Sequence, residues 1–382
     1  MKSIRLFIRI FICTLTLLSC NKKEPKDNKL KTIIFRDQYV DLIDKFDFKF
    51  IPLETKEESL ISLINYIQLV DDKLFILDAY KKEEVLVFDT SGHYLSKISN
   101  KGEGPKEYVS LSGMHINQKN KSLILSDYKN KLLFYDLDSC KLQKTLHSSL
   151  CGNDFIQLNE NRFVFTSIKG FEQLGKNKKQ YVLITDSTEK MINYGYPLPF
   201  YANYSSTLSG SKFYSVNKDT FIYHNLFPEI YKIKSDRIEP AYRLSFESMK
   251  FPPIDFLRRA SKDKRDYTSD LNQSDYIKAY SIFETNNVTM IYLMQHQPVF
   301  AFYDKATQES FTLPIKDYYK SLQLNALLFP LGATDEYIIF KVNLDDVDSP
   351  NEIKNPELRK VVEKRKEDDN CIIALGKWKR NS

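Results

Sequence analysis

The sequence has little of several residue types, and each shortage excludes a class of protein. Of its 382 residues, 11 are Gly and one is Trp, whereas 24 are Tyr and 26 are Phe. So few glycines exclude a collagen-like or glycine-rich low-complexity chain. The hydrophobic fraction of 42% and the charged fraction of 28% are typical of a globular protein. Because aromatic residues favour pleated, half-buried surfaces, the composition predicts a β-rich fold.

The common catalytic signatures are also missing. The sequence has no HExxH motif, no paired-carboxylate motif and no Ser-His-Asp arrangement in a recognised order. The glycines of Gly102-Glu103-Gly104-Pro105 resemble those of a phosphate loop, but the Lys-Ser/Thr ending and a following helix are lacking. We interpret this stretch as a tight turn. The sequence does not decide whether the protein is an enzyme, but the missing motifs favour a protein without catalytic activity.

Neither sign of charge is in large excess. The 56 Lys and Arg against 50 Asp and Glu give a net charge of +6, and three of the cations, Lys2, Arg5 and Arg9, precede Cys20. Without those three the net charge is +3. Proteins that bind nucleic acid concentrate basic residues on one face. We therefore expect no nucleic-acid partner.

The first 20 residues have the pattern of an export signal. Basic residues are followed by an apolar run, 10–18, that is too short to span a bilayer. Leu17-Leu18-Ser19-Cys20 is similar to a bacterial lipobox, in which the Cys is lipidated. The sequence predicts a signal peptide over 1–19, then a lipidated (palmitate-bearing) Cys20 and a polar tether over 20–45. The alternative is an ordinary secretory signal with an incidental Cys.

Strand-like runs that end in an acid recur along the chain. The acids are Asp89, Asp136, Asp186, Asp236 and Asp304, with successive spacings of 47, 50, 50 and 68 residues. A period near 50 residues that is made of β units is typical of propeller blades. We interpret the acids as caps of the turns that follow them. Each unit divides into four strands, a to d, and in the first unit these are 63–70, 74–77, 85–89 and 94–98.

The number of units predicts six blades and a ring that both ends of the chain close together. A sixth run, 371–375, lacks a fourth strand, and a spare alternating run, 46–53, precedes the first unit. Pairing the two closes the ring without open edges. The expected fold is an all-β six-bladed β-propeller over 46–382. It carries two short helical insertions, at 251–267 and 350–367.

Several stretches resemble the lipid-anchored six-bladed β-propeller proteins of the bacterial envelope, which are relatives of the NHL and TolB-like propellers. They are FIPLET at 50–55, Leu77-Asp78, VFDTSG at 87–92, GEGPKEY at 102–108 and DDNCII at 368–373. The resemblance implies the fold and an envelope location, which we expect to be the outer membrane. It implies no particular activity, because fold does not determine function.

The expected binding site lies at one mouth of the central channel. In a propeller the b–c and d–a loops surround that mouth, and here they are long and aromatic. Tyr has an apolar ring and a polar tip, which suits a protein, peptide or glycan ligand. Packing between blades is the alternative role for each ring. The candidate binding residues are Tyr80, Lys82, Tyr108, Tyr128, Lys129, Phe171, Tyr201, Tyr204, His224, Gln295 and His296.

These features predict an envelope lipoprotein that binds a ligand or a protein partner without a cofactor. The alternative is an envelope hydrolase or lyase in which His115, His224 and His296 hold zinc or calcium at the channel mouth. Cys140 and Cys151 are expected at opposite ends of one strand. They would then be too far apart for a disulfide.

Overall fold

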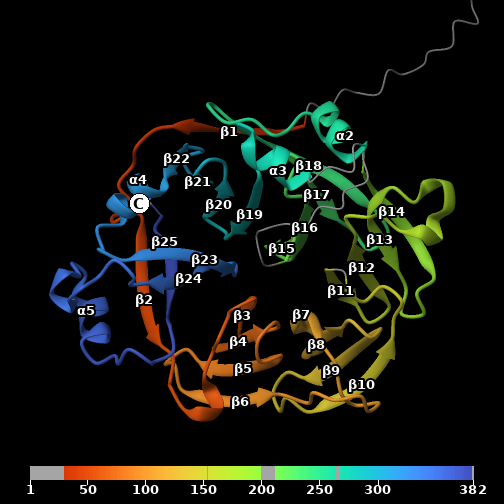
Figure 1. Cartoon of the computed structure of the whole chain (residues 1–382), viewed down its shortest axis with the longest axis horizontal. Coiled ribbons are helices and arrows are strands. Elements are labelled where there is room, and N and C mark those ends of the chain that lie inside the picture. The colour runs from red at the N-terminus through yellow and green to blue at the C-terminus, as the bar shows by residue number, and fades with distance from the viewer. Residues whose placement is uncertain (1–29, 153, 199–210, 263–266, 381–382) are drawn as a thin grey trace, which may run out of the picture. The chain divides into compact units, whose positions relative to one another are not determined.

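The computed structural model describes residues 30–152, 154–198, 211–262 and 267–380. A compact unit, Thr32–Ser382, holds all the strands assigned to these residues. The strands form six four-stranded antiparallel blades around a common centre, with one additional strand at the rim (Figure 1). The six-bladed β-propeller expected from the sequence is therefore confirmed.

Each blade runs outward from the centre through strands a, b, c and d. Blade 1 has β3 (Tyr66–Val70), β4 (Lys73–Asp78), β5 (Glu84–Asp89) and β6 (Tyr94–Ile98). Blade 2 has β7 (Leu111–Asn117), β8 (Ser122–Asp127), β9 (Lys131–Asp136) and β10 (Leu142–His147). Blade 3 has β11 (Phe155–Asn159), β12 (Arg162–Thr166), β13 (Gln180–Thr185) and β14 (Met191–Pro197).

The other three blades follow the same order. Blade 4 has β15 (Phe213–Val216), β16 (Asp219–Tyr223), β17 (Glu229–Ile233) and β18 (Ile238–Phe246). Blade 5 has β19 (Ala279–Glu284), β20 (Val288–Met294), β21 (Pro298–Asp304) and β22 (Ser310–Pro314). Blade 6 has β23 (Leu327–Ala333), β24 (Tyr337–Asn343), β25 (Ile372–Trp378) and, as its outer strand, β2 (Phe46–Pro52).

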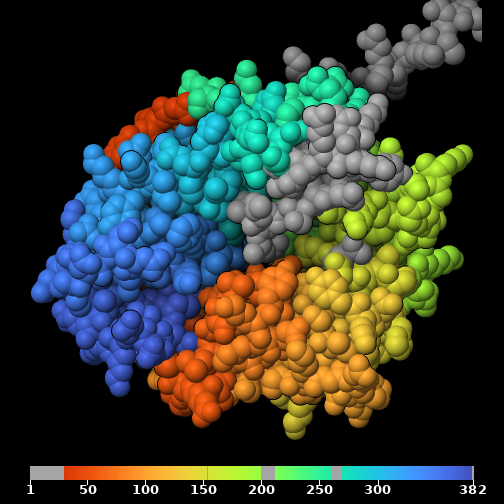
Figure 2. Space-filling view, viewed as in Figure 1, coloured from red at the N-terminus to blue at the C-terminus, as the bar shows by residue number. Residues whose placement is uncertain are grey.

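The core lies in the seams between neighbouring blades. Strands b and c are covered on both faces, so β4 and β5 are almost wholly buried, whereas the outer strand β6 alternates between half-buried and exposed residues and only Ile98 is buried. Double burial explains why the inner strands are continuous apolar runs in the sequence. Side chains fill the space between adjacent blades at the surface as well (Figure 2).

The ring closes as the sequence predicts. Strand β2 pairs antiparallel with β25, with Phe46 opposite Trp378 and Pro52 opposite Ile372. The ring of Phe46 meets that of Trp378 edge-on at 4.9 Å between centroids. Pro52 is tolerated because it ends an outer edge strand, where the ladder needs no further donor.

The predicted tether over 20–45 is wrong in its second half, because the fold begins earlier. Strand β1 (Thr32–Asp37) lies at the rim between β18 of blade 4 and β22 of blade 5 and runs parallel to both (Figure 1). Phe35 is fully buried and stacks on Phe246 at 5.0 Å. Alternate apolar residues such as Ile33 and Phe35 face the core, so the segment buries enough apolar surface to be ordered.

The helices lie in the connections between strands. The insertion between blades 4 and 5 forms α2 (Ile254–Lys262) and α3 (Tyr267–Gln273), in agreement with the sequence. Helix α4 (Ile315–Leu322), between blades 5 and 6, was not predicted, and its Tyr318 stacks on Phe300 at 3.7 Å. Short 3-10 helices occur at η1 (Glu57–Ser59), η2 (Gln118–Asn120), η3 (Glu172–Asn177) and η4 (Pro350–Glu352).

The insertion within blade 6 forms α5 (Pro356–Val362), which Asn355 caps through hydrogen bonds from the backbone N–H groups of Glu357 and Leu358. Its charged sequence favoured a solvated surface helix, but Leu358 is fully buried in the same core cluster as β2 and β25. One face of the helix therefore packs on the propeller.

The acids that end strand c cap the next turn in four of the five cases. For example, Asp89 Oδ1 accepts hydrogen bonds from the backbone N–H groups of Ser91 and His93, and Asp136, Asp186 and Asp304 do the same in their own turns. Asp236 instead pairs with Arg237. These carboxylates are structural, as expected.

Cys140, Cys151 and Cys371 are free thiols. Cys140 lies in the turn before β10 and Cys151 follows that strand, so the two lie at opposite ends of it. Among the residues that the structure describes, no helix is both long enough and apolar enough to cross a membrane.

Candidate functional site

Six of the predicted binding residues lie in b–c turns and reach the surface. Tyr80 of blade 1 is 68% exposed and Tyr128 of blade 2 is 52% exposed. Lys82 and Lys129 lie beside them, and Lys129 pairs with Glu103 at 3.5 Å. In blade 5 the side chains of Gln295 and His296 both bond to Asp275.

Other predicted binding residues belong to the core instead. Tyr108 is fully buried in the cluster of blades 1 and 2, and its hydroxyl donates to the Glu83 carbonyl at 2.5 Å. Phe171 is 3% exposed and packs in the cluster of blades 2 and 3. These rings fill the seams because each blade must bury its flanks against the next. Tyr201 and Tyr204 lie outside the described residues.

The three histidines of the metal alternative have separate partners. His115 Nε2 contacts the Gln157 carbonyl at 3.3 Å, and His296 Nε2 contacts Asp275 Oδ1 at 2.9 Å. His224 is enclosed by aromatic rings. Within the described part of the chain, no three His, Cys, Asp or Glu side chains are grouped so that they could hold a metal ion.

Polar side chains of blades 3 and 4 meet where their inner strands begin. Asp154 precedes β11, and its Oδ2 accepts hydrogen bonds from Ser211 Oγ at 2.9 Å and from the Lys212 backbone N–H at 2.6 Å. Ser211 and Lys212 directly precede β15, the inner strand of blade 4. Burial raises the pKa of the Asp154 carboxyl, although these hydrogen bonds oppose the shift.

Lys212 is the cation of this region. Burial lowers the pKa of its ammonium group to about 8, and the charge of Asp154 opposes the shift. The Nζ atom lies 5.9 Å from the centre of the Tyr223 ring, which is a cation–π distance. The Tyr223 hydroxyl in turn donates to the Ser211 carbonyl at 3.3 Å.

Tyrosines from several blades converge on the same region. Burial raises the pKa of the Tyr66 hydroxyl, and the nearby Asp154, Tyr80, Tyr128 and Tyr223 raise it further. Tyr66 begins the inner strand of blade 1, and Tyr80 and Tyr128 come from the b–c turns of blades 1 and 2. We call these five residues, together with Lys212, the channel-mouth site. It brings together two exposed rings that the sequence predicted and four residues that it did not.

The Tyr128 ring rests on a glycine. Gly152 has φ +86°, and a Cβ atom added there would lie 3.2 Å from Tyr128 Cδ1. A side chain at position 152 would therefore be strained and would press on the ring. The contact holds an exposed aromatic ring in place, which lowers the entropy lost when a ligand stacks on it.

The seam between blades 3 and 4 continues from this site. His224 follows β16 and is 1% exposed, and its ring packs edge-on against Tyr181 at 4.8 Å. Its Nδ1 accepts a hydrogen bond from the Leu226 backbone N–H at 3.2 Å. The neutral ring therefore carries its proton on Nε2. That atom is buried and has no partner among the residues that the structure describes, and the same is true of Asn225 Nδ2.

Tyr196 is the strained residue of this seam. Its φ of 59° is an outlier for a bulky side chain. The ring is 5% exposed and lies 4.4 Å from Tyr231 and 5.4 Å from Tyr181. Its hydroxyl donates to the Glu229 carbonyl at 3.0 Å. Backbone strain of this kind costs about 1–3 kcal/mol and concentrates at functional sites.

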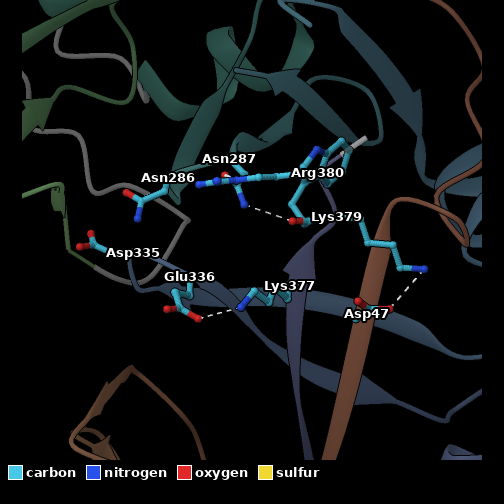
Figure 3. A pocket seen from close by; sticks show the side chains of 9 residues that line it. Asp47, Asn286, Asn287, Asp335, Glu336, Lys377, Lys379 and Arg380 are labelled. Carbon is cyan, nitrogen blue, oxygen red and sulfur yellow. Dashed lines mark hydrogen bonds and ion pairs between the residues drawn. The ribbon is translucent and has the colours of Figure 1, made fainter. Parts of the chain in front are cut away.

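A separate polar depression of about 560 Å³ opens on the opposite face, where β25 closes the ring (Figure 3). Its charges pair with each other: Lys377 with Glu336 at 2.9 Å and Lys379 with Asp47 at 3.2 Å. Arg380 Nε donates to Asn287 Oδ1 at 3.1 Å. This depression lies where the two ends of the ring join, and its charges are already paired with each other. The channel-mouth site is therefore the better candidate for binding.

Sequence reasoning missed Tyr66, Asp154, Lys212, Tyr223 and Asn225. One signal was available, because Asp154 and Lys212 directly precede the inner strands of consecutive blades. Aligning the repeats by strand a would have placed both residues at the same mouth. Their contact with each other depends on the position of the two blades in the ring.

Comparison with known proteins agrees with this architecture. A protein from Bacteroides fragilis, described as a presumed exported protein, has 25% identical residues and a TM-score of 0.84 over 92% of this chain and 100% of its own. A member of the duf4221 family from Bacteroides vulgatus has 12% identity and a TM-score of 0.56, over 90% of this chain and 98% of its own. That second likeness supports the fold alone. None of the curated proteins compared with this sequence matches it.

The model of one family matches residues 21–341, which is most of the chain, and that family is described as a 6-bladed beta-propeller. The match agrees with the blade count seen in the structure. The chain therefore belongs to the DUF5128 family of six-bladed β-propellers.

Proposed function

We propose that this protein is a lipid-anchored binding protein of the bacterial envelope, and that it takes a protein, peptide or glycan ligand at the channel-mouth site. The observation that carries the proposal is the meeting of two exposed tyrosines, Tyr80 and Tyr128, with the polar residues Asp154 and Lys212. Exposed rings supply contact area, and a few fixed polar groups beside them supply orientation.

The export signal and the likeness to an exported protein support the envelope location. In this proposal Cys20, which lies outside the described residues, carries the acyl chains. Eleven residues separate it from the first residue of β1. Even fully extended, such a segment spans about 40 Å. The rim of blades 4 and 5 would then stay close to the membrane, and we expect this to be the outer membrane.

The binding proposal is tested by removing the two exposed rings together. We expect the Tyr80→Ala/Tyr128→Ala double variant to fold normally, because both side chains are exposed, and to lose most of the envelope material that the parent protein retains from detergent extracts. Tyr39→Ala is the matched control, because Tyr39 is 43% exposed but lies outside this site. Equal retention by all three proteins would contradict the proposed site.

The anchor is tested separately by Cys20→Ser. In cells fed labelled palmitate, the parent protein should carry the label and sediment with membranes. The variant should carry none and should appear in the soluble fraction. An unlabelled parent protein would show that Cys20 is not acylated, and it would leave the binding proposal untouched.

A further inference from the structure

His224 has a buried donor for which the described residues supply no acceptor. Because Nδ1 accepts the Leu226 N–H, Nε2 carries the proton, and the described residues supply no acceptor for it. An unpaired buried donor costs roughly 1–3 kcal/mol. The neighbouring Asn225 is 3% exposed and has an unpaired amide nitrogen as well. Two adjacent donors are therefore left without acceptors in one turn of the seam.

The electrostatic environment of His224 is positive. Burial, together with the charge of Lys212, lowers the pKa of the imidazole to about 3. Two acids of blades 3 and 4 have partners of their own: Asp154 accepts from Ser211, Phe155 and the Lys212 backbone, and Glu229 pairs with Arg243 at 3.6 Å. A group that satisfies both donors beside Lys212 must be an acceptor, and a negative charge on it is favoured.

We propose that the turn at His224 and Asn225, together with Lys212, binds an oxyanion of the ligand: a carboxylate, sulfate or phosphate. This assigns a chemical class to the ligand of the proposed function and rests on that function. The Nε2–H of His224 and the Asn225 amide donate to the oxyanion, and Lys212 supplies the opposite charge. Tyr181, Tyr196 and Phe227 form the aromatic walls around the imidazole.

Access to this subsite requires a ring to move, because His224 is 1% exposed. Tyr196 is the residue that we expect to move, because its backbone is held at a strained φ of 59° and movement would relieve that strain. Its centroid lies 6.4 Å from that of His224. Binding of an oxyanion and relaxation of Tyr196 are thus coupled.

The test is a titration of the full mature protein with glucuronate, inorganic sulfate and inorganic phosphate. Binding is monitored by NMR of the protein with its histidines labelled with ¹⁵N. We expect at least one of these ions to shift the His224 Nε2–H resonance in a saturable manner at millimolar concentration. If none of the three does so, the proposal is overturned. If only a shift without saturation appears, the ion acts through ionic strength, and the proposal is overturned as well.

Two variants of His224 separate the donor from the fold. In His224→Gln the amide nitrogen takes the place of Nε2 and keeps the donor. In His224→Asn the amide oxygen takes the place of Nδ1, keeps the bond from Leu226 and leaves no donor at the Nε2 position. We expect His224→Asn to weaken binding by about tenfold or more, the effect of losing a hydrogen bond to a charged group, and His224→Gln to bind nearly as the parent.

His115→Asn is the matched control, because His115 is a partly buried histidine whose Nε2 has a partner outside this seam. It should bind the oxyanion as the parent does. If His224→Asn binds as tightly as the parent, the subsite is refuted. These readouts need no natural ligand, so the two proposals can fail separately. The oxyanion subsite can fail while Tyr80 and Tyr128 still prove necessary for envelope binding. Equally, the two tyrosines can prove dispensable while the subsite still binds an oxyanion.

Discussion

Mild acid should destabilise this propeller because two of its histidines are buried as neutral rings. Burial lowers the pKa of His224 to about 3 and that of His115 to about 4, whereas an unfolded histidine titrates near 6.5. The unfolded chain therefore binds more protons than the native protein between these values. The stabilising contribution is fully present above pH 6.5 and is lost as the pH falls toward the native pKa values.

The magnitude follows from the width of that window. Between pH 7 and pH 5 the loss is about 2 kcal/mol for His224, because the slope approaches about 1.36 kcal/mol for each pH unit below pH 6.5. His115 adds a smaller loss, because its side chain is partly exposed. Asp154 acts in the opposite direction: its native pKa is raised, so the native protein gains protons first as the pH falls. Lys212, with a pKa of about 8, stays charged in both states across this window.

The measurement is urea unfolding at pH 7 and pH 5, monitored by the fluorescence of Trp378. This residue is the single tryptophan of the sequence, and it is buried. The parent should lose about 2 kcal/mol or more of unfolding free energy. His224→Asn should be less stable than the parent at pH 7 but should lose about 2 kcal/mol less between the two pH values. His296→Asn, which changes an exposed side chain, controls for mutagenesis. Identical pH dependence in the parent and in His224→Asn would refute a buried neutral His224.

Three further outcomes follow from the structure. Phe35→Ala should lower the free energy of unfolding by about 3–5 kcal/mol in urea, because it removes a fully buried ring stacked on Phe246 in the seam of blades 4 and 5; an unchanged midpoint would mean that β1 is not docked. Oxyanion affinity measured by calorimetry should fall between pH 7 and pH 9, because Lys212 loses its proton near pH 8; an affinity that stays constant would exclude Lys212 from the subsite. Trp378→Phe should cost about 1–3 kcal/mol in a thermal or urea melt, because it leaves the buried Asp304 carboxylate without the indole N–H that lies 2.8 Å away; a neutral substitution would show that water replaces this bond.

Much of the fold could be predicted because it depends on local periodicity. The buried inner strands read as apolar runs, and acids such as Asp89 and Asp136 mark the turns at a regular period. The unmatched runs at the two ends identified the closure of β2 on β25. Strand β1 was missed because it is short, and because its partners, β18 and β22, are more than 200 residues away in the sequence.

The candidate site was predicted only in part. Tyr80 and Tyr128 were assigned to the right turns, because the position of a turn follows from the strands on either side of it. Tyr108 and Phe171 are identical in type to surface aromatics, and only their packing against the next blade shows that they belong to the core. His224 was selected as a possible ligand, and the structure places it instead in an aromatic seam with an unpaired donor.

The sequence alone thus determined the blade count, the strand order within each blade and the way the ends join, because each of these follows from side-chain spacing along a strand. The tertiary structure decided which tyrosines are exposed, that Asp154 meets Lys212, and that Nε2 of His224 has no partner in the described part of the chain. These properties depend on which side chains from distant blades share one seam. Pairing between strands sets the spacing within a blade, but the charge and hydrogen bonding of a seam emerge only when the ring has closed.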